Sequence, residues 1–182
     1  MALTDQALIT VAQAKEYLKV SNSDNDNVIE ALIESATRKT EDYCASRWVS
    51  RSIVETHIGQ GEQSLYLYRM PISEVASVTI DGTAYTGYEE RLSIGMLYGV
   101  WTKLTEIIVT YTAGYVADRT TAVANIPDAV IAVMEALGIW YNNRLGATYE
   151  QVGGIGALNY GKGLTLPDSV KAQLSSLRKR IL

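Results

Sequence analysis

The chain has 182 residues, of which 47% are hydrophobic and 20% are charged, and its formal net charge is −4. This composition is typical of a globular chain with a substantial core, and no apolar run approaches the roughly 20 residues that a membrane-spanning helix needs. A single cysteine, Cys44, excludes an intrachain disulfide and a cysteine-rich metal site.

The charge is unevenly distributed along the chain. Residues 1–46 carry four basic and eight acidic side chains, residues 47–161 carry seven and eleven, and residues 162–182 carry five and one. An acidic body with a basic tail suits contacts between copies of the chain, and a solvated basic tail explains the pattern equally well. The first five residues lack a basic stretch followed by an apolar one, so we expect synthesis in a cytoplasm.

Two helices are predicted at the start of the chain. Thr10 and Gln13 have the spacing of a capping box, which predicts a helix over residues 10–19. After a short polar link, Ser23 or Asp24 is expected to cap a second helix over residues 24–46. Its buried stripe is predicted to comprise Val28, Ile29, Leu32, Ile33, Ala36, Thr40, Tyr43 and Cys44. Cys44 is therefore expected to be buried filler rather than a nucleophile.

A sheet is predicted next, because the apolar period changes from 3.6 residues to 2 after Trp48. We expect a small antiparallel sheet over residues 51–115, inserted between the second helix and a third helix over residues 127–144. The only histidine, His57, shares one face of the first strand with Glu55 and Ile53. A surface histidine close to Glu55 is the expected role.

The last forty residues are the least typical of a compact domain. Residues 146–166 contain six glycines without a sustained apolar period, which indicates a flexible segment. A terminal helix is predicted from Pro167 onward. We expect an α+β fold, with a helical body and β insertion over residues 1–145 and a mobile arm over residues 146–182. The residues expected to dock this arm on a partner are Pro167, Val170, Leu174, Leu177, Arg178, Lys179, Arg180 and Ile181.

Motifs for enzymatic chemistry are incomplete. The segment from Gly156 to Gly163 reproduces part of a phosphate-binding loop, but glycine replaces the hydroxyl residue that would follow Lys162 and hold Mg²⁺. Asp24 begins a segment like a calcium loop, but its fifth position is Val28 and its twelfth is Ser35, where Asp or Asn and then Glu are needed. No catalytic residue, metal or cofactor is therefore expected. A nucleotide-binding enzyme is kept only as an alternative.

Four groups of residues resemble, in order, the head-to-tail connector (adaptor) proteins of tailed bacteriophages, in the version that carries a β insertion. They are Ile9-Thr10 with Tyr17-Leu18; Asp24-Asn25-Asp26 with Ile29, Leu32, Ile33 and Glu41-Asp42-Tyr43; Leu65 to Leu67 and Met70-Pro71-Ile72 with Val109 to Tyr115; and Ile126-Pro127-Asp128 with Trp140 to Arg144. The resemblance covers about residues 9–145 and leaves out the tail.

The resemblance implies a structural protein of the virion neck rather than an enzyme. Such proteins form a ring, commonly a dodecamer, beneath the portal protein, with a tail or stopper protein below and DNA passing through the lumen. An acidic body without a basic face agrees with a channel that does not retain phosphates. Neither a membrane nor sequence-specific DNA binding is implied.

Contacts between subunits are expected to pair unlike charges on the flanks of helices. The candidate residues are Glu30, Glu34, Arg38 and Arg144. An alternative function is that the basic terminal helix, with Arg178 to Arg180, forms a nucleic-acid-binding accessory module. Cations at a helix C-terminus also stabilise the helix itself, so the pattern does not require nucleic acid.

Overall fold

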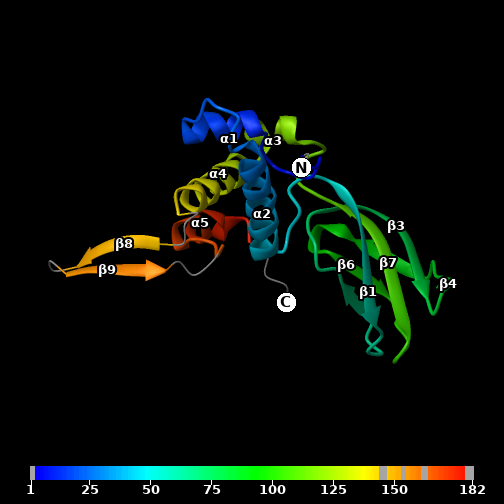
Figure 1. Ribbon diagram of the computed structural model, residues 1–182. Helices are drawn as coiled ribbons and strands as arrows, with labels where there is room; N and C mark the ends of the chain where they lie inside the picture. Colours follow the sequence, from blue (N-terminus) through cyan, green and yellow to red (C-terminus); the bar gives the residue numbers. More distant parts are fainter. Residues whose placement is uncertain (1–2, 144–146, 153–154, 161–163, 179–182) are drawn as a thin grey trace.

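A computed structural model describes residues 3–143, 147–152, 155–160 and 164–178, and it shows a helical part joined to a β part (Figure 1). The helices are α1 (Val11–Leu18), α2 (Asp26–Cys44), α3 (Ala122–Asn125), α4 (Pro127–Asn142) and α5 (Asp168–Gln173). The strands are β1 (Arg51–Ile58), β2 (Ser64–Tyr66), β3 (Ile72–Ile80), β4 (Thr83–Ala84), β5 (Tyr88–Arg91), β6 (Met96–Gly99), β7 (Glu106–Ala113), β8 (Ala147–Val152) and β9 (Ile155–Tyr160). The α+β prediction, with a β insertion between α2 and α4, is confirmed.

The first helices begin for different reasons. At α1, the Thr10 side chain accepts from the backbone N–H of Gln13, and the Gln13 side chain accepts from Thr10, so the predicted capping box is present. At α2, the predicted cap is wrong, because Asn25 is the N-cap residue and makes no side-chain capping bond. Instead, Asp26 in the first turn of α2 accepts from Nζ of Lys15 at 2.8 Å and so ties α1 to α2.

The helical part has its own apolar core. Side chains of α2 and α4 fill it together with the segment before α1: Ala7, Leu8, Ile9, Ile29, Leu32, Ile33, Ala36, Cys44, Ala129, Val130, Val133, Leu137 and Trp140. Cys44 is fully buried, as predicted, and its burial raises the pKa of the thiol to about 11. Val28, which was expected on the buried stripe, is 42% exposed because it lies at the edge of that face.

The β part is built from two antiparallel sheets. One has the strand order β1-β7-β3-β4, and the other has the order β2-β6-β5. Alternate residues of β7 (Ile107, Val109 and Tyr111) are buried and pack with Leu97 of β6 and Val78 of β3. One face of the larger sheet therefore covers the smaller sheet, and its other face is directed to solvent.

The terminal helix belongs to the helical core. Val170 and Leu174 have no exposed surface and pack in the same cluster as α2 and α4, and Leu177 packs against it. The Trp140 indole N–H donates to the carbonyl of Thr165 at 3.0 Å, which fixes the approach to α5. The expectation of a free apolar face on this helix is wrong for Val170 and Leu174, because α2 and α4 of the same chain already cover it.

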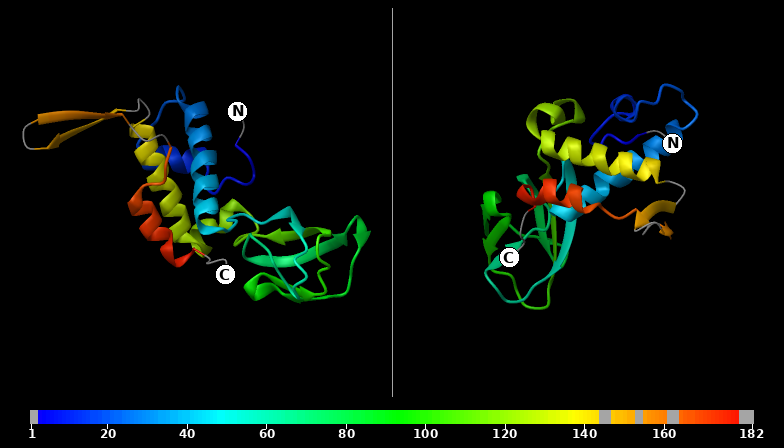
Figure 2. Two further views of the ribbon diagram at one scale, coloured as in Figure 1. Left: turned by 90° about the horizontal axis from the view of Figure 1, so that it is seen from below. Right: turned by 90° about the vertical axis from the view of Figure 1, so that its left-hand side faces the viewer.

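The glycine-containing segment also differs from the prediction. Its described residues form β8 and β9, which pair antiparallel with Ala147 opposite Tyr160 and Val152 opposite Ile155. This hairpin extends from the helical part on the side away from the β part (Figures 1 and 2). A backbone ladder needs no apolar period, so the sequence pattern did not reveal it.

The position of α5 yields a stability prediction. Leu174→Ala should destabilise the fold by about 3 kcal/mol, because it removes a fully buried side chain and leaves a cavity. Ser169→Ala, at an exposed position of the same helix, should leave stability nearly unchanged. Urea denaturation followed by circular dichroism measures both. Equal stabilities for the two variants would show that α5 lies outside the core.

Candidate interaction surfaces

A buried carboxylate joins the helical part to the β part. Glu41, near the end of α2, is 2% exposed. Its Oε1 accepts from the backbone N–H of Trp48 at 2.9 Å and from Nη1 of Arg51 at 3.0 Å, and its Oε2 accepts from Nη2 of Arg51 at 2.5 Å. Arg47 adds a longer contact of 3.4 Å to Oε2. The bidentate pair fixes the first residue of β1 against α2.

Neighbouring contacts reinforce the same junction. The Trp48 indole N–H donates to Oγ1 of Thr40 at 2.9 Å, and both residues are buried. Burial lowers the pKa of Arg47, although the charge of Glu41 raises it. Sequence reasoning missed this cluster, since Glu41 lay off the predicted apolar stripe. Arg47 and Arg51 in the link to β1 were the available signal.

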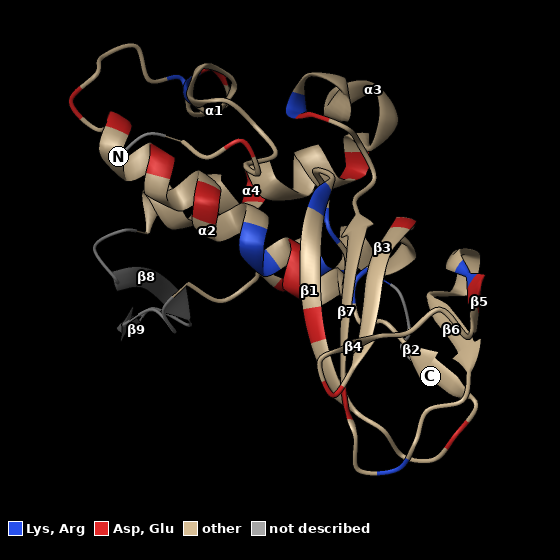
Figure 3. Cartoon of the chain, turned by 90° about the vertical axis from the view of Figure 1, so that its right-hand side faces the viewer, with Lys and Arg blue, Asp and Glu red and all other residues tan. Residues whose placement is uncertain are grey.

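The predicted inter-subunit residues follow one flank of α2. Glu30, Glu34 and Arg38 are four residues apart and therefore share a face of the helix, on which Figure 3 shows a row of charged positions. Glu34 accepts from the backbone N–H of Thr4 at 2.7 Å, so one of its carboxylate oxygens already accepts a hydrogen bond within the chain. Arg38 is exposed, and Arg144 lies outside the described residues. Their role between subunits stays a prediction.

The predicted docking residues of the C-terminal helix fall into three groups. Val170 and Leu174 are buried in the chain's own core, whereas Pro167 and Leu177 are partly exposed. Arg178 is exposed and places its guanidinium 5.0 Å from the ring centre of Tyr43 on α2. Lys179, Arg180 and Ile181 lie outside the described residues. The helix thus has no unoccupied apolar stripe formed by Val170 and Leu174.

His57 belongs to a polar cluster on the inner face of β1. Its Nε2 lies 3.2 Å from Oε2 of Glu55, as the sequence predicted, but it is buried and stacked on Tyr68 rather than on the surface. Glu55 also accepts from the Tyr111 hydroxyl and from the backbone N–H of Tyr68. Burial raises the pKa of Glu55, but these hydrogen bonds outweigh it, and the pKa is lowered overall.

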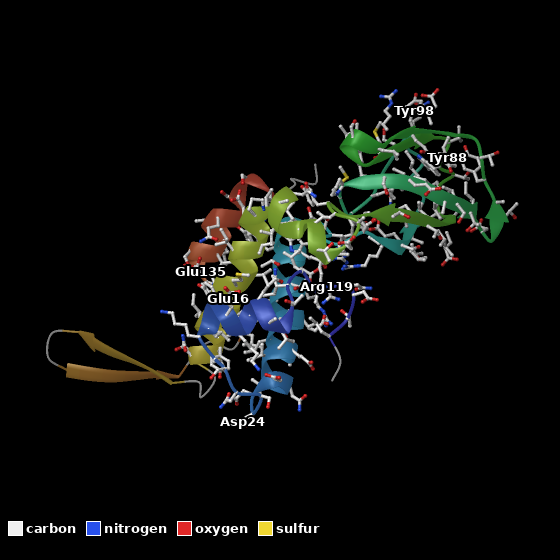
Figure 4. All side chains as sticks on the ribbon, turned by 90° about the horizontal axis from the view of Figure 1, so that it is seen from above. Glu16, Asp24, Tyr88, Tyr98, Arg119 and Glu135 are labelled. Carbon is white, nitrogen blue, oxygen red and sulfur yellow. The ribbon has the colours of Figure 1, made fainter. Side chains whose placement is uncertain are left out.

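The outer face of the larger sheet carries exposed apolar and hydroxyl side chains together with the acidic Glu106 and Glu74. On this face Val54 lies opposite Thr110 and Thr56 lies opposite Ile108. Val54 is 64% exposed, and Ile58 is 52% exposed. Figure 4 places Tyr88 and Tyr98 at the other end of the molecule from Glu16 and Glu135. The outer face of the β part is therefore mainly apolar and hydroxyl-bearing, whereas the flank of α2 is charged.

The hollows between elements have both polar and apolar walls, and the cations of the one described next already make hydrogen bonds within the chain. One of about 370 Å³ lies between the N-terminal segment and the turn at Ala117–Thr120. Its cations, Arg51 and Arg119, are bonded to Glu41 and to the carbonyl of Thr4. Within the described residues no group of three or more His, Cys, Asp or Glu side chains could hold a metal ion.

One helix pair reaches the apolarity of a membrane span only in combination. No single helix of the described residues is long and apolar enough to cross a membrane, whereas Arg119–Asn125 and Pro127–Asn142, bent by 110°, meet that criterion together by length and composition. Much of α4 is buried in the helical core, including Val133 and Leu137.

Comparison with known proteins gives the family. Residues 7–180 match the model of the head completion protein family, so the chain belongs to that family. This membership confirms the resemblance to head-to-tail connectors and extends it into the tail, which the sequence resemblance had left out. No curated protein matches the chain by sequence.

Solved structures share the fold. The chain is similar to a protein in the neck of an empty gene transfer agent particle computed with C6 symmetry, with a TM-score of 0.69 and 19% identity over 100% of this chain and 95% of that one. The chain is also similar to one in the virion of a native gene transfer agent particle, with a TM-score of 0.67 and 17% identity over 100% of this chain and 95% of that one. For a chain in the neck of a native gene transfer agent particle computed with C12 symmetry, the TM-score is 0.67 and the identity is 18%, over 100% of this chain and 94% of that one.

Loss of the Glu41 charge should weaken the junction. Glu41→Gln should destabilise the fold by about 3 kcal/mol, because it leaves Arg51 without its buried counterion. The matched control is Asp42→Asn, since Asp42 is 53% exposed and its pairing with Arg69 should contribute less than about 1 kcal/mol. Chemical denaturation compares the two. A loss for Asp42→Asn as large as that for Glu41→Gln would contradict the assignment.

Stability should depend on the charge of Glu55. Because its folded pKa is lowered from an ordinary value of 4.5, its contribution is present above that pH and is lost as pH falls through the lowered pKa. Tyr111→Phe removes one hydrogen bond to the carboxylate, so the gap in melting temperature from wild type should be largest at neutral pH and narrow in acid. Tyr66→Phe, at an exposed tyrosine, serves as control. A gap independent of pH would contradict the link.

Proposed function

We propose that this protein is a structural component of the virion neck that forms a ring beneath the portal and connects the DNA-filled head to the tail. The observation that carries the proposal is the family match over residues 7–180, together with a fold shared with neck proteins of gene transfer agent particles. Those necks were computed with C6 and C12 symmetry, which supports a cyclic arrangement of copies.

The charge distribution supports a passive channel. The chain carries 20 acidic and 16 basic side chains, and its described cations near the junction are paired with carboxylates within the chain. A lumen lined by such a surface would not retain phosphates strongly, since strong backbone binding needs available cations. DNA therefore passes through without sequence-specific contacts, and the protein acts without catalysis or a cofactor.

Attachment to the portal is still assigned to the C-terminal region, but to other residues than Val170 and Leu174. Val170 and Leu174 hold α5 on the body, so docking falls to the exposed side of this helix and to the basic residues from Arg178 to Arg180. A tail or stopper protein binds the opposite opening of the ring. The chain has a charged α2 flank and a mainly apolar sheet face, which are distinct surfaces for distinct partners.

Ring formation should depend on the α2 flank. Arg38→Glu should lower the fraction of portal-bound rings about tenfold, because it replaces a cation by an anion on a flank that already holds Glu30 and Glu34. Lys39→Glu, an exposed neighbour on another side of α2, should have little effect. Native mass spectrometry and cryo-microscopy of the protein mixed with its portal measure the ring directly.

Two outcomes would overturn parts of this proposal. The absence of a coaxial ring for wild type with its portal would contradict the neck function. Equal losses for Arg38→Glu and Lys39→Glu would contradict a specific role for the flank. Retardation of short duplex DNA by the protein, decreasing steeply with salt, would instead support the nucleic-acid-binding alternative.

A further inference from the structure

Among the described residues, the outer edge of β1 pairs with no other strand. β1 is the terminal strand of its sheet, and among the described residues its backbone makes no backbone hydrogen bond to any element except β7. The backbone N–H of Gly59 donates to Thr105 at 2.9 Å, continuing the register that pairs Ile58 with Glu106. Because hydrogen-bonded and non-bonded pairs alternate, the N–H and C=O groups of Ser52, Val54, Thr56 and Ile58 point away from β7. Of these groups, the carbonyl of Ile58 accepts from Nε2 of Gln60 at 3.5 Å.

The edge carries none of the usual protection. The charged residues of β1, Arg51 and Glu55, are directed to Glu41 and to Tyr111 within the chain. Val54, Thr56 and Ile58 are exposed, and the β1–β7 register runs without a bulge. Natural proteins normally shield long, flat edges with outward charges, proline or bulges. An eight-residue edge without these features fits a strand supplied by a partner.

An unsupported hairpin lies at the other end of the molecule. Within the described residues β8 and β9 pair only with each other. A two-stranded hairpin alone is marginally stable in water, so it gains from addition to a further sheet. Figures 1 and 2 show that it extends from the helical part away from β1, which places it out of reach of the β1 edge of the same chain.

We propose that the β8–β9 hairpin of one copy adds to the free edge of β1 in the next copy. This inference rests on the proposed ring, in which each copy supplies a hairpin at one end and receives one at the other. Such head-to-tail contacts close into a ring when the rotation permits. A six-residue strand fits the eight-residue edge, and main-chain hydrogen bonds supply the attraction.

The first test removes one edge donor without removing a bond to β7. Thr56→Pro deletes an N–H that faces the free edge, a position where proline is tolerated in a strand. Its monomer should melt close to wild type, while the fraction of portal-bound rings falls at least tenfold. Thr56→Val keeps the N–H and the branched shape, so it should assemble as wild type. Assembly of Thr56→Pro at wild-type levels would overturn the inference.

The second test does not depend on the folding of a proline variant. In a Cys44→Ala background, separate Thr56→Cys and Thr148→Cys proteins are mixed with the portal and oxidised gently. The inference predicts a disulfide that joins the two different variants and is absent without assembly. If wild type forms rings but no such crosslink appears at Thr148 or at other β8 and β9 positions tested in turn, the hairpin contact is wrong and the ring stands. If wild type forms no ring with its portal, the proposed function itself fails.

Discussion

The buried Glu41 carboxylate is the contact on which the arrangement of the two parts depends. The chain changes from helix to strand between Cys44 and Arg51, and this link must bury polar backbone without losing its hydrogen bonds. Glu41 accepts from Trp48 and Arg51, while the backbone of Arg47 bonds to Met70 and to Tyr115. The entry and the exit of the β part therefore meet at one point beside α2.

This junction explains how one chain can present separate surfaces. Two apolar cores, one among helices and one between sheets, give each part its own stability. The bidentate contact between Arg51 and Glu41 limits movement between the two parts, so the charged flank of α2 and the outer face of β1 and β7 keep a fixed relation. A subunit of a ring needs such a relation, because small angular errors accumulate around a closed circle.

The C-terminal segment has a structural role besides any docking role. Leu174 completes the helical core, and Gln173 donates to Glu135 on α4. The family match extends to residue 180, which agrees with a tail that belongs to the fold. The chain leaves the helical core at the end of α4, forms β8 and β9, and returns with α5. The core is complete once α5 has packed against it. Contacts with other proteins are then left to exposed side chains and free strand edges.

The elements that depend on local chemistry could be predicted from the sequence alone. The capping box of Thr10 and Gln13, the 3.6-residue period of α2 and α4, the change to a period of 2 at β1 and the proximity of His57 to Glu55 are all set by residues close together in the chain. The ordered motifs were also sufficient to indicate the family, which the match over residues 7–180 confirms.

Which surfaces are covered, in contrast, becomes known only from the folded chain. The apolar spacing of Val170 and Leu174 is the same whether a partner or the chain's own α2 and α4 bury it, so sequence could not choose between them. Glu41 is buried because Arg51, ten residues away, folds back onto it. The pairing of β8 with β9 uses backbone groups that every residue carries, and it therefore left no apolar pattern. The burial of Val170 and Leu174 depends on residues distant in sequence, which a local pattern does not record.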